Sequence, residues 1–179
     1  HRGVVFRRSR HYHFFCTGVD MALGFHLVEE EPRGFHHIFG THFTPFQLGG
    51  IGALGHRRLS VIDLSPAGHQ PMATVDQRYW IVYNGEIYNH HEIRDECKIK
   101  GYSFQSESDT EVILAAYIYW GKECVHKFQG MWAFIIVDRT EKTVFVSRDR
   151  FGIKPLYYWH SPNNFLAFSS EIKASPANL

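Results

Sequence analysis

The hydrophobic pattern of the chain changes from an extended to a helical period in two places. The first helical stretch covers residues 89–100, with Asn89 as its expected cap and the following glycine as its stop. The second begins at Ser108, where Glu111 three residues later completes a capping-box pattern, and it ends before Gly121. Because apolar residues lie on nearly every side of this second helix, the sequence predicts that it is deeply buried.

Most of the remaining pattern predicts strands. Two pairs of apolar runs flank short polar loops of the kind that join hairpins, and two further runs precede the helices. These extended stretches are residues 53–63, 79–83, 132–138, 143–148, 156–159 and 165–169. Their continuous apolar runs indicate strands that are covered on both faces, which two sheets packed between helical layers would provide.

Length and composition fit one globular domain. The 179 residues are 44% hydrophobic and 16% aromatic, which is enough for a well-packed core. The net charge of +1 argues against a nucleic-acid binder, since the basic cluster at residues 2–10 is typical of a solvated terminus. No apolar run approaches about 18 residues, and the basic start lacks a following apolar stretch, so neither a membrane span nor a secretory signal is expected.

The chain has three cysteines, which cannot all pair and therefore fit a reducing cytoplasm better than a disulfide framework. Cys97 lies on the apolar side of the first helix, so a buried structural thiol is expected there and at Cys124. The third, Cys16, follows His11 and His13 at a loose spacing. Zinc sites usually show paired Cys or His at both ends, so no metal site is predicted.

Candidate chemistry is concentrated where Asn84 and Gly85 follow a hydrophobic strand and Glu86 comes next. A glycine at the junction of a strand and a helix lets the backbone approach a ligand closely. The Asn84 amide and the Gly85 N–H can then point at one place, which is how an oxyanion hole is built, and Glu86 could hold a substrate ammonium. Most Asn-Gly pairs are plain turns, so this pair needs support from the rest of the chain.

Several further motifs occur in series around this pair. They are Leu54-Gly55-His56-Arg57-Arg58-Leu59-Ser60-Val61-Ile62-Asp63-Leu64-Ser65, Gly68-His69-Gln70-Pro71-Met72, Ser108-Asp109-Thr110-Glu111, Phe128-Gln129-Gly130-Met131-Trp132 and Arg148-Asp149-Arg150-Phe151-Gly152-Ile153-Lys154-Pro155-Leu156-Tyr157-Tyr158. In this order they closely resemble the glutaminase domain of glutamine-hydrolysing asparagine synthetases, which are class II glutamine amidotransferases, over residues 51–175. The resemblance implies an α+β fold, the four-layer αββα sandwich of N-terminal-nucleophile hydrolases.

The resemblance also assigns roles to individual residues. Asn84 and Gly85 would form the oxyanion hole for glutamine hydrolysis, and Val61 would touch the ligand through its backbone. Arg58 would pair with the α-carboxylate of glutamine, because a planar guanidinium suits two oxygens. A surface arginine on a strand is the alternative for Arg58.

Acidic residues complete the implied pocket. Glu86 and Asp109 would receive the α-ammonium of glutamine. Asp109 also suits a helix start, where the helix dipole favours an acid, and the two roles are compatible. Asp149, Arg150 and Lys154 are expected to form structural ion pairs around a turn.

The first fifty residues depart from the family pattern. The family's nucleophile is a cysteine at the first position of the mature chain, whose own α-amine can accept the thiol proton. Residue 1 here is histidine, and Arg33-Gly34-Phe35-His36 keeps only the first half of the family's Arg-Gly-Pro-Asp motif. Three explanations stay open: a reported start that differs from the native one, a propeptide of residues 1–15 that leaves Cys16 as the nucleophile, and a degenerate domain. Residues 1–50 are therefore a divergent segment of undetermined order.

The implied function is hydrolysis of glutamine to glutamate and ammonia for an asparagine synthetase-type reaction. The Gly-rich pyrophosphate loop of the family's synthetase domain has no counterpart after residue 133, so that domain is expected to be absent. ATP and magnesium belong to it, and no cofactor is expected in this chain. Glutamine and a synthetase domain or subunit are the expected partners, in the cytoplasm, with homodimer formation left open. The alternative is an inactive glutaminase-like domain that binds glutamine or a partner without turnover.

Overall fold

The computed structural model describes residues 4–7, 21–24, 46–47, 53–56, 69–160 and 166–170. Their strands form two five-stranded sheets, in the orders β1-β8-β7-β6-β5 and β3-β4-β2-β10-β9, with antiparallel pairing throughout. The first sheet comprises β1 (Val4–Arg7), β5 (Met72–Ala73), β6 (Tyr79–Ile87), β7 (Gly130–Asp138) and β8 (Thr143–Arg148). The second comprises β2 (Met21–Gly24), β3 (Phe46–Gln47), β4 (Ala53–His56), β9 (Tyr157–His160) and β10 (Leu166–Ser169).

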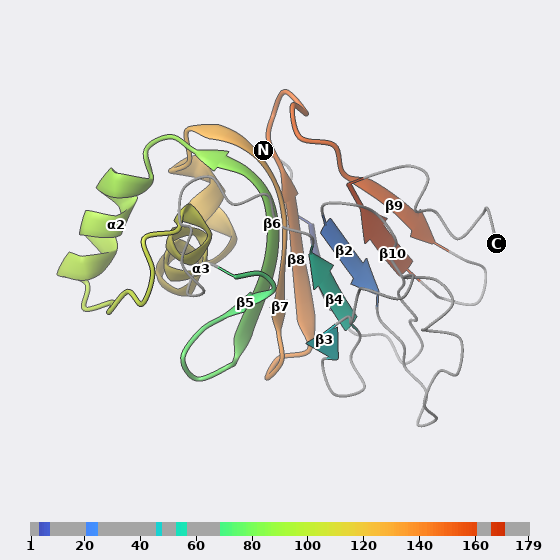
Figure 1. Cartoon of the computed structure of the whole chain (residues 1–179), viewed down its shortest axis with the longest axis horizontal. Helices are drawn as coiled ribbons and strands as arrows, with labels where there is room; N and C mark the ends of the chain where they lie inside the picture. Colours follow the sequence, from blue (N-terminus) through green and yellow to red (C-terminus); the bar gives the residue numbers. More distant parts are fainter. Residues whose placement is uncertain are drawn as a thin grey trace.

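Helices cover one face of the first sheet, and the second sheet lies against its other face (Figure 1). They are α2 (His90–Ile99), α3 (Asp109–Trp120) and the 3₁₀ helix η2 (Gly121–His126). The described residues therefore supply three layers, αββ, of the predicted four-layer sandwich. A helical layer outside the second sheet is not among the described residues. None of the helices in this part of the chain is long and apolar enough to span a membrane.

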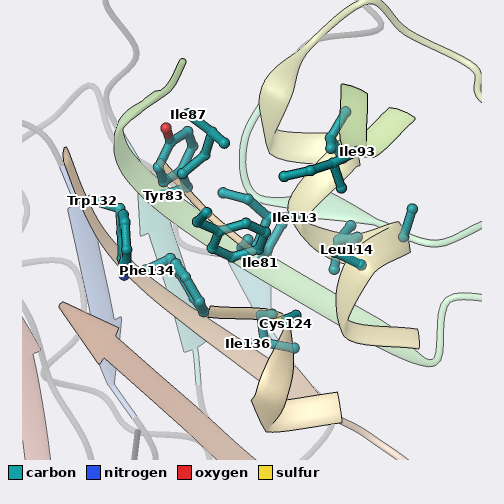
Figure 2. Packing of buried hydrophobic residues seen from close by; sticks show 14 of the residues in the cluster. Ile81, Tyr83, Ile87, Ile93, Ile113, Leu114, Cys124, Trp132, Phe134 and Ile136 are labelled. Carbon is teal, nitrogen blue, oxygen red and sulfur yellow. The ribbon is translucent and has the colours of Figure 1, made fainter. Parts of the chain in front are cut away.

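A hydrophobic core lies on each side of the first sheet. The core beneath the helices packs Ile81 and Phe134, from β6 and β7, against α3 residues such as Leu114 (Figure 2). The core between the sheets contains the neighbouring strand residues, such as Val82 and Ile135. Because successive side chains of a strand point to opposite faces, this alternation indicates the face on which the later residues of β6 lie.

Both predicted helices and both predicted hairpins are confirmed, but the start of α2 is built differently from the prediction. Asn89 holds the cap position, yet its side chain makes no capping hydrogen bond to the helix. Its amide instead donates to the Lys127 carbonyl (2.9 Å) and accepts from the Gln129 N–H (2.9 Å). Through these two hydrogen bonds, Asn89 links the start of α2 to the segment that precedes β7.

The start of α3 follows half of the predicted capping box. Ser108 is the cap, and its hydroxyl oxygen accepts from the Thr110 N–H (3.2 Å). Glu111 does not return to Ser108, so the second half of the prediction is wrong. Its carboxylate accepts from the Gln105 N–H (2.9 Å) and from both the N–H and the hydroxyl of Ser106 (2.7 Å each). The loop before α3 folds back over the helix start and places these donors, of which Ser106 is buried, within reach of Glu111.

Among the described residues, three strands come from the first fifty positions of the chain. β1 pairs with β8 at the edge of the first sheet, and β2 lies between β4 and β10 in the second. β3 pairs with β4. Both sheets therefore combine strands from before and after residue 50.

Candidate functional site

The exposure of β6 changes at the Asn-Gly pair. The strand is buried from Trp80 to Tyr83, becomes half-buried at Asn84 and Gly85, is exposed at Glu86, and is buried again at Ile87. The pair therefore lies inside β6 and not after its end, which corrects the expected junction. The reason is a non-local one, since β7 begins as early as Gly130 and its pairing with β6 extends to Ile87.

Position 85 requires a glycine because the backbones of β6 and β7 approach each other closely here. A Cβ on Gly85 would overlap the Met131 carbonyl of β7, and one on Gly130 would overlap the Glu86 carbonyl of β6. Both glycines have positive φ angles, +159° and +151°. The two glycines permit a close backbone approach that any side chain at either position would block.

The N–H of Gly85 points away from β7. Trp132 stands opposite Gly85, and its backbone groups are directed to Asp149: its carbonyl accepts from the Asp149 N–H (2.8 Å) and its N–H donates to the Asp149 carboxylate (3.3 Å). In an antiparallel pair, hydrogen-bonded and non-bonded positions alternate. Gly85 and Trp132 therefore form a non-bonded pair, and the Gly85 N–H faces the other edge of β6.

That edge is open because β5 is short. β5 pairs only with Trp80 and Ile81, so the later part of β6 has no strand on this side among the described residues. The N–H groups of Tyr83 and Ile87 face the same edge and are bound by side chains, Gln70 Oε1 (2.6 Å) and Asp109 Oδ2 (3.1 Å) respectively. The Gly85 N–H lies between them in this row, as a donor for an oxyanion would.

Asp109 connects α3 to this edge. It is the first residue of the helix, and its Oδ2 accepts from the Tyr83 hydroxyl (2.8 Å) and the Ile87 N–H (3.1 Å). These two donors flank the Asn84–Glu86 segment. The residue is 4% exposed, and the two hydrogen bonds from β6 both end on Oδ2, so neither β6 donor occupies Oδ1.

The electrostatics of Asp109 suit a cationic ligand. Burial raises the pKa of its carboxyl above the ordinary value, and the Ile87 N–H, the Tyr83 hydroxyl, His90 and the Thr110 N–H only partly offset this effect. Burial likewise raises the pKa of Tyr83 well above its usual value, so the phenol stays a neutral donor. A buried carboxylate with a raised pKa lacks full compensation for its charge, which an ammonium group would supply.

Asn84 and Glu86 face the opposite side of β6 from Tyr83. The even-numbered residues Trp80 and Val82 lie in the core between the sheets, so the strand period places Asn84 and Glu86 on the same face. No hydrogen bond joins either side chain to another residue in the described part of the chain. An amide and a carboxylate are thus presented beside the Gly85 N–H.

Asp149 supports this arrangement from the far side of β7. Its carboxylate accepts four backbone N–H groups, those of Trp132, Phe151, Ile153 and Lys154, at 3.0 to 3.3 Å. The predicted ion pair with Lys154 is therefore wrong, because the turn directs the backbone N–H of Lys154 to the carboxylate. Burial would raise the pKa of Asp149, but the four hydrogen bonds outweigh it and lower the pKa.

The cysteines of the described region are not nucleophiles. Cys97 and Cys124 are fully buried in the core beneath the helices, as the sequence predicts. Burial raises the pKa of Cys97 to about 11 and that of Cys124 to about 12. Since the thiolate is the reactive form, both are inert near neutral pH.

The structure thus brings Asn84, Gly85, Glu86 and Asp109 to one end of β6. The other predicted site residues, Cys16, Arg58 and Val61, lie outside the described residues, as do His11 and His13. Sequence reasoning missed Tyr83 and Gln70, which hold the edge in place. Their only signal was their position within motifs, directly before Asn84 and inside Gly68-His69-Gln70-Pro71-Met72.

Two antiparallel sheets packed face to face, with helices on the outer face of the first, match an α+β sandwich of the N-terminal-nucleophile hydrolase type. The chain belongs to the family described as "Glutamine amidotransferase domain", which matches residues 46–178.

Similar proteins agree with this assignment. "Asparagine synthetase [glutamine-hydrolyzing] 1" of Bacillus subtilis is 48% identical over 120 residues, 67% of this chain and 19% of the relative. "Asparagine synthetase [glutamine-hydrolyzing]" of Zea mays is 40% identical over 121 residues, 68% of this chain and 20% of the relative. The chain thus spans about a fifth of the length of these relatives.

A solved structure shares the fold. It is the glutamine phosphoribosylpyrophosphate amidotransferase of Bacillus subtilis complexed with ADP and GMP. It matches with a TM-score of 0.53 and 23% identity, covering 66% of this chain and 27% of that one.

Proposed function

We propose that this chain is a glutaminase domain that hydrolyses glutamine to glutamate and ammonia for an asparagine synthetase-type reaction. The observation that carries the proposal is the open edge of β6, where the Gly85 N–H, the Asn84 amide and two carboxylates lie within one short segment and its helix contact. Family membership and the names of the relatives support glutamine as the substrate.

The acidic residues hold the amino-acid end of the substrate. Asp109 and Glu86 receive the α-ammonium, Asp109 through Oδ1, while Arg58 pairs with the α-carboxylate and the Val61 backbone touches the ligand. Two opposite charges fixed at one carbon orient the side-chain amide of glutamine toward Asn84 and Gly85. Positioning of this kind converts binding energy into rate.

The reaction is acyl transfer through a thiol, for which Cys16 is the candidate. Its sulfur attacks the side-chain amide carbon, and the negative charge that develops on oxygen is stabilised by the Asn84 amide and the Gly85 N–H. The C–N bond then breaks, ammonia leaves with the transferred proton, and water hydrolyses the thioester to glutamate. A cysteine at a chain terminus supplies its own base, so Cys16 acts best once residues 1–15 are removed.

A synthetase domain or subunit then uses the released ammonia as its reagent. The relatives are named for asparagine synthesis, and the chain covers only about a fifth of their length. ATP and magnesium act in the synthetase part, and the glutaminase site needs neither.

Replacement of Asn84 by alanine tests the proposal. Loss of one oxyanion donor should lower kcat for glutamate release by about 100- to 1,000-fold while glutamine affinity changes little. Glutamate and ammonia are quantified with purified protein, and glutamine binding is followed by calorimetry.

Asn89→Ala is the matched control for this experiment. It removes the amide that binds Lys127 and Gln129, so it should lower the Tm and leave kcat within about twofold. If wild-type protein binds glutamine but releases no glutamate, the chain has a binding role and not a hydrolytic one. Unchanged kcat in Asn84→Ala would remove Asn84 from the oxyanion hole.

A further inference from the structure

Tyr83 combines a core position with a polar contact to the site. Its ring lies beside Ile87 in the core beneath the helices (Figure 2), and the residue is 3% exposed. Its hydroxyl donates to Asp109 Oδ2 at 2.8 Å. A phenylalanine would fill the same core volume, so the hydroxyl is there for the carboxylate.

The hydroxyl and the Ile87 N–H reach the same oxygen from two positions four residues apart on β6. Two donors on one oxygen restrict rotation of the Asp109 carboxylate and hold Oδ1 in a defined direction. With the Ile87 N–H alone, β6 would hold the carboxylate through a single hydrogen bond.

Gln70 makes a second link between the same two elements. Its Oε1 accepts from the Tyr83 N–H (2.6 Å), and its amide nitrogen donates to the Thr110 hydroxyl (3.3 Å) at the start of α3. Tyr83 is thus fixed through its backbone by the residue that also fixes the helix start. The hydroxyl and Asp109 therefore approach each other from two anchored elements.

We propose that Tyr83 is a positioning residue, which orients the Asp109 carboxylate so that Oδ1 meets the α-ammonium of the substrate amino acid. The inference rests on the proposed function and adds to it the residue that gives selectivity for an α-amino acid over a simple amide. Tyr83 does not touch the substrate and acts only through Asp109.

Tyr83→Phe separates this role from a structural one. The variant should raise KM for glutamine about tenfold, the size expected for one lost hydrogen bond to a charged group, and leave kcat within about twofold. Binding of glutaramate, which has the amide and one carboxylate but no α-ammonium, should not change. A general loosening of the core would weaken the binding of glutamine and of glutaramate alike.

Two further variants sharpen the test. In an Asp109→Asn background, Tyr83→Phe should cause no further loss of glutamine affinity, because the charge it orients is gone. Tyr117→Phe removes a phenol from the same core, on α3 against Phe145, and should leave KM unchanged.

The possible outcomes distinguish a failure of this inference from a failure of the proposed function. Wild-type protein that binds no glutamine would overturn the proposed function and the inference together. If wild-type protein binds glutamine, an unchanged affinity for glutamine in Tyr83→Phe, measured by calorimetry or as KM, would overturn the inference alone. An equal loss of affinity for glutaramate would do the same.

Discussion

At the scale of single residues, the two buried aspartates near β6 show that the placement of donors decides the effect of a substitution. The two hydrogen bonds that β6 donates to Asp109 both end on Oδ2. The four donors of Asp149 are divided, with Phe151 and Ile153 on Oδ1 and Trp132 and Lys154 on Oδ2. An asparagine can reproduce the first arrangement with its carbonyl oxygen, but it cannot reproduce the second.

Asp109→Asn and Asp149→Asn should therefore have opposite effects on stability. Asp149→Asn turns an NH₂ group toward two N–H donors and should lower the free energy of unfolding by about 2–3 kcal/mol. Asp109→Asn keeps both hydrogen bonds and removes a poorly compensated charge, so it should be at least as stable as wild type. Urea denaturation at neutral pH measures both variants, and a lower stability of Asp109→Asn would contradict the account.

The pH dependence of these variants follows from the sign of each pKa shift. Asp109 has a raised folded pKa, so its favourable contribution is present below the ordinary pKa and is lost as the pH rises through the raised value. Asp149 has a lowered folded pKa, so its contribution is present above the ordinary pKa and is lost as the pH falls through the lowered value.

At the scale of secondary-structure elements, Asp138 joins three strands. At the end of β7 its carboxylate accepts three hydrogen bonds from the guanidinium of Arg78, which directly precedes β6 (2.8 Å at the shortest). Its Oδ1 also accepts from the Thr140 and Glu141 N–H groups in the turn to β8. Burial would raise the pKa of Asp138, but Arg78 and these N–H groups lower it on balance.

Asp138→Asn should lower the free energy of unfolding by about 1–2 kcal/mol at pH 7. The folded pKa of Asp138 is lowered, so the difference from wild type should shrink as the pH falls through that value. Urea titrations at several pH values provide the measurement. Asp95→Asn, in an exposed pair with Lys98, is the matched control and should stay within about 0.5 kcal/mol of wild type. A difference that does not depend on pH would refute the role given to the charge of Asp138.

Local patterns predicted the elements well because each pattern is complete within its own segment. Helices α2 and α3 and the β7–β8 hairpin follow from periodicity, glycine stops and a polar loop. The end of β6 did not follow, since Asn84-Gly85 resembles a turn locally and is extended only by pairing with β7. The partners of Asn89 and Glu111 were missed for the same reason, because they lie in loops whose path depends on tertiary packing.

The candidate site was only partly visible in the sequence. Asn84, Gly85 and Glu86 stand together in one motif, and the family resemblance added Asp109. The contacts of Tyr83 and Gln70 could not be deduced, because a buried tyrosine and a glutamine before a proline are unremarkable until the fold places α3 beside β6.

At the scale of the whole molecule, the site depends on how the layers meet. The helical layer brings Asp109 to β6, the short β5 leaves the edge of β6 open, and β7 with Asp149 turns the Gly85 N–H toward that edge. The second sheet packs against the face of β6 that carries Trp80 and Val82, and the strand period places Asn84 and the exposed Glu86 further along the same face. No single layer contains the site, which explains why a pattern of strands and helices alone does not reveal it.

Calorimetric titration of glutamine into wild-type protein and Asp109→Asn tests the account most directly, because binding needs no nucleophile. We predict saturable binding to wild type and a loss of about 100-fold in affinity for the variant, as expected when one partner of a buried charge pair is removed. Asp95→Asn, on the exposed surface of α2, should bind as wild type does. Equal affinity of wild type and Asp109→Asn for glutamine would contradict the account.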